Sequence, residues 1–175
     1  RAQPFAPGRI RTHPPDPVGG GPIVRPALFP GAAYPLPSGA LGVRGRVTRG
    51  GEPMRWARVE ARRPGGGDVV GRAHGDAHGE FLLLLEPAAA LGAELPRPLR
   101  VRVAVFGPDD PPDPDDAPDP EADPLWDLPR EGAGLNADGA GALAGTRLPG
   151  GYREGVSREV VVGLGGPGRE EFDFS

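Results

Sequence analysis

Apolar and polar residues alternate along the chain in a run that begins at Leu41. The stretch LGVRGRVT (41–48) places Leu41, Val43 and Val47 on one side of an extended chain and arginines on the other. A period of two with one polar side is typical of a half-buried β-strand. We therefore predict a strand here, with Gly45 on its apolar side.

Six further short stretches carry strand signals, with turn residues between them. They are 56–62, 69–74, 80–85, 99–106, 158–164 and 169–174. The side chains expected in the core are Ala57, Val59, Ala61, Phe81, Leu83, Leu85, Leu99, Val101, Val103, Val105, Val160, Val162, Phe172 and Phe174. Short strands at close intervals favour an all-β, seven-stranded antiparallel sandwich, and the segment 86–96 is expected to add one helical turn.

Residues 1–40 are predicted to form an extended, Pro-rich arm. They contain ten prolines and six glycines, so neither a helix nor an inner strand can persist there. The arm nevertheless carries apolar residues, among them Ile23, Leu28, Phe29, Tyr34 and Leu36. A flexible linker seldom has that apolar density. We therefore expect 22–37 to lie in a groove, either on its own domain or on another subunit.

Residues 108–157 are predicted to be a long acidic insertion that divides the sandwich into 41–107 and 158–175. The insertion has three arginines and twelve acids, and its first 17 residues contain seven prolines and eight acids. Such a segment cannot bury a core, although Trp126 and Leu128 offer apolar anchors. Because phosphates would be repelled by this block, nucleic acid is not expected as a partner.

The composition restricts the chemistry available. The chain has no Cys, which excludes disulfides and thiolate sites and suits a reducing compartment. No run approaches the ~18 apolar residues of a membrane-spanning helix. The opening RAQPFAPGRIRTHPP lacks the apolar region of a secretion signal. It also lacks an initiator Met, so we expect a processed or trimmed piece of a longer product.

The stretch GRAHGDAHGEFLLLL (71–85) contains the best candidate for chemistry. His74, Asp76 and His78 would share a face of a continuous strand and could bind a metal ion. Gly75 and Gly79 interrupt such a strand, and an Asp between them accepts backbone N–H groups in a turn. A hairpin turn is therefore favoured over a metal site, and no cofactor or metal is expected.

No catalytic constellation emerges elsewhere. Ser38, Ser157 and Ser175 lie in no G-x-S-x-G motif, and the acidic run lacks the spacing of a calcium loop. We therefore expect no enzyme and no small-molecule substrate. The outward arginines of the strands indicate either an ordinary solvated face or a surface for an acidic partner.

The segment VRGRVTRGGEPMRWARVEARRPGGGDVVGRAHGDAHGEFLL (43–83) is similar to the carboxypeptidase regulatory-like, transthyretin-like β-sandwich domain. Three elements match that family's pattern: Gly45–Val47, Ala57–Ala61 and Asp76–Phe81. Gly75 stands where the family usually has Thr, and the closing EFDF also fits. The resemblance implies a transthyretin-like or immunoglobulin-like sandwich and no particular chemistry.

The flanks YPLPSGALGVRGRV (34–47), DPLWDLP (123–129) and LPGGY (148–152) resemble accessory proteins of contractile injection systems and phage-tail-like particles. This resemblance implies a structural assembly module, made in the cytoplasm and released as part of a particle. Its partners would be other protein subunits, reached through the arm. The residues expected to bind them are Ile23, Leu28, Phe29, Tyr34, Leu36, Trp56 and Trp126.

Three other functions remain open from the sequence. The first is an exported adhesion or carbohydrate-binding sandwich, which requires a secretion signal. The second is an accessory domain of a larger hydrolase, which requires a catalytic domain in the same reading frame. The third is a metal enzyme that uses His74 and His78.

Overall fold

The structure, a computed structural model, describes residues 27–36, 39–65, 67–86, 98–111, 123–129, 141, 144–163 and 168–175. Phe29–Asp109 and Tyr152–Ser175 belong to one compact unit, whereas Leu28 and Asp110–Gly151 belong to a second. Most of the expected helical turn at 86–96 and the centre of the acidic run lie outside the described residues.

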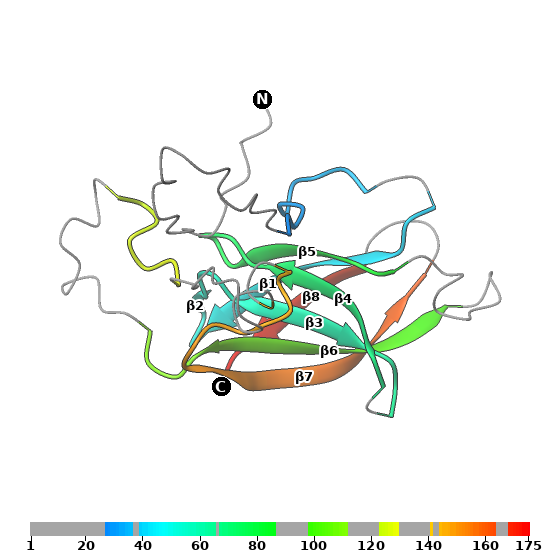
Figure 1. The fold of residues 1–175 in the computed structure, drawn as a ribbon. Helices are drawn as coiled ribbons and strands as arrows, with labels where there is room; N and C mark the ends of the chain where they lie inside the picture. Colours follow the sequence, from blue (N-terminus) through cyan, green and yellow to red (C-terminus); the bar gives the residue numbers. More distant parts are fainter. Residues whose placement is uncertain are drawn as a thin grey trace, which may run out of the picture. The chain divides into compact units, whose positions relative to one another are not determined.

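The first unit consists of eight strands in two sheets (Figure 1). The strands are β1 (Gly42–Arg49), β2 (Glu52–Pro53), β3 (Arg58–Arg62), β4 (Val69–His74), β5 (Glu80–Leu84), β6 (Leu99–Pro108), β7 (Tyr152–Val162) and β8 (Gly168–Asp173). One sheet contains β2, β1, β5 and β8, and the other has the order β4-β3-β6-β7. The predicted all-β class is confirmed, since the described part of the chain contains no helical element.

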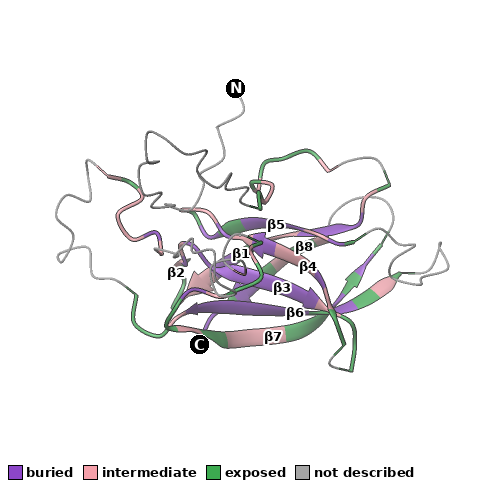
Figure 2. Cartoon of the chain, viewed as in Figure 1, coloured by how far each residue is buried: buried purple, intermediate pink, exposed green. Residues whose placement is uncertain are grey.

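The two sheets share one core of buried apolar side chains. Val43 and Val47 reach it from the first sheet, and Val59, Val103 and Val105 reach it from the second. Figure 2 shows this burial along β3 and β6, whereas most of β7 is intermediate or exposed. The alternation along the chain therefore predicted the inward positions, and two sheets around one core are consistent with a β-sandwich.

The strand pairing differs from the prediction in two respects. First, β2 is a two-residue strand that pairs with the end of β1 inside the segment expected to be only a turn. The described strands therefore number eight, not seven. Second, β8 runs parallel to β1, with Val47 opposite Phe172, while every other pairing of the described strands is antiparallel.

The boundary predicted for the acidic insertion is wrong at its end, because β7 begins at Tyr152. Residues 152–157 therefore belong to a strand that pairs with β6. In this ladder Val156 lies opposite Val105 and Glu154 lies opposite Phe106, which leaves Gly155 as an extra residue in a bulge. A bulge shifts the alternation of side chains by one position, so the period-two pattern does not extend through it.

At one edge of the core, β4 comes close to β5 and joins the two sheets. The Glu86 N–H donates a 2.8 Å hydrogen bond to the Val70 carbonyl. A Cβ at Gly71 would lie only 2.5 Å from the Leu84 carbonyl oxygen, so the approach requires glycine at this position.

At the opposite edge, side chains connect β7 to β8. The Arg158 guanidinium donates to Glu170 Oε2 at 2.6 Å and to the Glu171 carbonyl at 2.8 Å. It also lies 4.5 Å from the centre of the Phe172 ring. The guanidinium of this arginine therefore covers the Phe172 ring while it pairs with Glu170, which closes this end of the apolar core.

The centre of β1 depends on the missing side chain of Gly45. A Cβ at this position would lie 2.4 Å from Phe81 Cζ and 2.8 Å from the Glu170 carbonyl oxygen. The Phe81 ring, which is fully buried, thus occupies the space that a side chain would need. The prediction that position 45 faces the core is confirmed, and the reason for glycine there is packing.

We expect Gly45→Ala to lower the free energy of unfolding by about 1–3 kcal/mol, because the added methyl forces Phe81 or β8 to move. Equilibrium urea denaturation would measure the loss. Gly163→Ala is the control, since a Cβ there meets nothing within 4 Å, and its effect should stay within about 0.5 kcal/mol. Equal stability of the two variants would contradict this packing argument.

Candidate interaction surface

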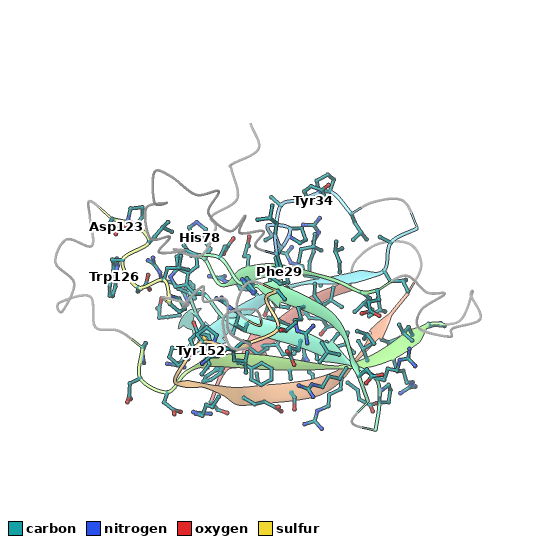
Figure 3. All side chains as sticks on the ribbon, viewed as in Figure 1. Phe29, Tyr34, His78, Asp123, Trp126 and Tyr152 are labelled. Atoms are coloured by element: carbon teal, nitrogen blue, oxygen red, sulfur yellow. The ribbon has the colours of Figure 1, made fainter. Side chains whose placement is uncertain are left out.

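Residues 29–36, called the strap below, pack on their own two-sheet unit. The Phe29 ring stacks on the imidazole of His74 in β4, with ring centres 4.0 Å apart and planes inclined by 25°. His74 lies opposite Arg58 and therefore on the outer side of the second sheet. Figure 3 shows Phe29 against the strands and Tyr34 on the far side of the strap, pointing away from them.

Further along the strap, Arg44 of β1 holds the backbone. Its guanidinium donates hydrogen bonds to the carbonyl oxygens of Ala32 and Tyr34. The strap then ends with Leu36, whose Cδ1 would lie 3.2 Å from a Cβ at Gly42. The same Cβ would lie 3.4 Å from Leu84 Cδ2, so Gly42 leaves a shallow apolar notch for Leu36 beside Leu84.

These contacts place the strap over the outer sides of both sheets, across the edge where β4 meets β5. Leu82 lies opposite Arg44 and points to the same outer side, yet it is fully buried and stands apart from the main core cluster. Of the two locations expected for the arm, the structure thus shows the chain's own domain for residues 29–36. In Figure 1 the strap, drawn in blue, runs over β5.

The environment of His74 keeps its imidazole neutral. Burial, and in second place the nearby Arg58 guanidinium, lower the pKa of His74 from 6.5 to about 3. A neutral ring suits the stack on Phe29, because a charged ring at this position would be desolvated and would face a second cation.

Asp76, between the two histidines, forms a turn. Its Oδ1 accepts hydrogen bonds from the backbone N–H groups of His78, at 2.8 Å, and Glu80, at 2.9 Å. Gly79 adopts a positive φ of 72°, as the turn requires. The predicted turn is therefore observed, but it is not a hairpin, because β4 pairs with β3 and β5 pairs with β1 in the other sheet. The described His, Asp and Glu residues form no group of three that could hold a metal ion.

The other residues predicted to bind partners are dispersed. Leu28, in the second unit, and Tyr34 have large exposed side chains, with 68% and 53% of their surface accessible. Trp126 lies half-buried in a turn of the second unit, where its backbone N–H donates to the Asp123 carbonyl at 2.9 Å. Ile23 lies outside the described residues.

Trp56 is buried, with 6% of its surface accessible, and its backbone has an unusual conformation. Its φ is +59°, in the left-handed region that large residues rarely adopt. In this conformation its carbonyl accepts hydrogen bonds from Tyr152 Oη at 3.1 Å and from Arg58 at 3.2 Å. The ring itself lies inside the unit. A role for Trp56 in binding a partner stays a prediction.

Several outward arginines of the second sheet form ion pairs within the chain. Glu60 of β3 is buried between Arg62, at 2.7 Å, and Arg72, at 3.2 Å. Arg102 of β6 pairs with Glu154 of β7 at 3.3 Å. The sequence left open whether the outward arginines face solvent or an acidic partner. Arg62 is paired with an acid on its own strand, whereas Arg72 and Arg102 are paired with acids on neighbouring strands.

Comparison with known proteins yields no match, whether to family models, to curated proteins or to solved structures. In the part of the chain that the structure describes, no helix is long and apolar enough to cross a membrane.

The lowered pKa of His74 makes stability depend on pH. The unfolded chain takes up the proton near pH 6.5 and the folded chain only near pH 3, so stability is complete above pH 6.5 and falls as the pH drops between these values. We expect His74→Gln to lose less stability than the wild type between pH 7.5 and pH 4.5, in ~25 °C urea titrations. His78→Gln, in the exposed end of the same turn, should follow the wild-type curve. Parallel curves for all three proteins would refute a neutral His74.

An alanine is usually more stable than a glycine at the same position, but the positive φ of Trp56 reverses this order of stability. Both Trp56→Ala and Trp56→Gly lose the buried ring, which costs about 3–5 kcal/mol. Only the Ala variant keeps the strain of a side chain at φ +59°. We therefore expect the Gly variant to be more stable than the Ala variant by about 1 kcal/mol in urea denaturation. An Ala variant of equal or greater stability would show that this backbone is unstrained.

Proposed function

We propose that this chain is a non-catalytic assembly module of a larger protein particle and binds a neighbouring subunit through its Pro-rich arm. The observation that carries the proposal is that the strap is held in place while one of its aromatic rings is exposed. Its ends are anchored by Phe29 and Leu36, and its backbone is held by Arg44, while the Tyr34 ring points to solvent. An exposed aromatic side chain on a backbone that is held in place is a typical anchor of a protein interface.

Two further points support a binding role over a catalytic one. The carboxylate of Asp76 is engaged by two backbone amides, and His74 lies under Phe29. The groups that could have formed an active site are thus used to build a turn and to seat the strap. The resemblance of 34–47 and 123–129 to accessory proteins of contractile injection systems and phage-tail-like particles supports such a particle as the setting.

The test compares exposed apolar residues inside and outside the arm. Tyr34→Ala keeps the carbonyl that Arg44 binds and removes only an exposed ring, so the fold should be as stable as before. We expect it to weaken binding to the neighbouring subunit by about tenfold or more, as loss of an aromatic anchor does. The native mass of the assembly, isolated from cells that express each variant, would show the loss.

Val161→Ala is the matched control, because Val161 is also 53% accessible but lies on β7. It should leave the assembly unchanged. If Tyr34→Ala assembles as the wild type does, or if the wild type is isolated only as a monomer, the proposed function is wrong.

A further inference from the structure

The strap is held by side chains alone. Its one internal backbone hydrogen bond joins the Tyr34 N–H to the Gly31 carbonyl at 2.9 Å. In the described part of the chain, no backbone hydrogen bond links residues 29–36 to a strand. Three contacts seat it: the Phe29 stack on His74, the two carbonyls on Arg44, and Leu36 at Gly42. A segment held in this way can leave its seat without breaking a sheet.

The seat of the strap, formed by His74, Arg44 and Gly42, suits an extended peptide of defined chemistry. His74 offers a flat neutral ring for an aromatic residue, and Arg44 offers donors for two carbonyls three and five residues further on. The notch at Gly42 accepts a leucine two residues after the second carbonyl. Phe29, Ala32, Tyr34 and Leu36 meet these requirements in order, so the segment seated there defines the ligand.

The connection from the strap to β1 has the properties of a hinge. Five residues, 37–41, separate Leu36 from Gly42, and five extended residues span at most about 17 Å. In the closed form, Leu36 nevertheless lies beside Gly42, so the two residues that flank the connection are close together. Gly39 is exposed and has a φ of +78°, with nothing within 4 Å of the position of a Cβ. The closed form thus depends on a left-handed residue that only glycine adopts without strain.

We propose that the strap exchanges between two copies of this chain, so that residues 29–36 of each copy bind the His74–Arg44–Gly42 seat of the other. The exchange rests on the proposed function, because it makes the arm the element that links subunits and names the second copy as the partner. Every contact of the closed form is repeated in the exchanged form. The equilibrium between the closed monomer and the exchanged dimer is then set by protein concentration and by the conformation of the hinge.

The first test changes the hinge alone. Gly39→Ala adds a methyl group that meets no neighbour but is strained at φ +78°. The strain penalises the closed turn, so the variant should form dimers about tenfold more readily than the wild type. Gly31→Ala, inside the strap at an equally open position, is the control and should behave as the wild type. Light scattering after size-exclusion chromatography, over a range of concentrations, measures the dimer.

The second test uses two full-length chains with complementary defects. One carries Phe29→Ala and Leu36→Ala, which damage the strap and leave the seat intact. The other carries Arg44→Ala and His74→Ala, which damage the seat and leave the strap intact. Each alone should be monomeric, and the mixture should form a heterodimer with one exchanged strap, identified by its mass in native mass spectrometry.

The outcomes separate this inference from the proposed function. A heterodimer in the mixture, together with more dimer for Gly39→Ala, supports the exchange. If the mixture and Gly39→Ala both remain monomeric, strap exchange is wrong, even where Tyr34→Ala still lowers assembly with another subunit. If the heterodimer forms but Tyr34→Ala leaves the native assembly intact, the exchange stands and the proposed function fails.

Discussion

The close approach of β4 to β5 is the constraint on which the other features of the surface depend. Gly71 permits it, because any Cβ at this position would collide with the Leu84 carbonyl. By joining the sheets at this edge, the approach brings His74, on the outer side of one sheet, near Arg44, on the outer side of the other. One segment of eight residues can then contact both sheets.

The two edges of the core are closed by different means. At β4 and β5 the backbones meet, whereas at β7 and β8 the gap is bridged by arginine side chains that lie over phenylalanine rings. Arg158 covers Phe172, and Arg153 lies 5.1 Å from the centre of the Phe174 ring. A cation over the face of an aromatic ring is attracted by the electrons of the ring, so each guanidinium stabilises the ring that it covers.

The sequence predicted what depends on local alternation and missed what depends on contacts between distant segments. The inward positions of β1, β3 and β6 follow from a period of two, and Asp76 was correctly expected to accept backbone N–H groups in a turn. The start of β7 was missed because the bulge at Gly155 interrupts the alternation. No local pattern indicates that Phe29 stacks on a histidine far along the chain, or that Glu60 is buried between two arginines.

The way in which Arg44 holds the strap has a consequence for how this segment can evolve. Because the guanidinium binds main-chain oxygens, which every amino acid supplies, the side chains at positions 32 and 34 are not needed for the hold. Selection can therefore redesign the solvent-facing side of the segment and retarget it to new surfaces. The two flanking apolar residues would meanwhile be constrained by the imidazole ring and the strand surface that they contact.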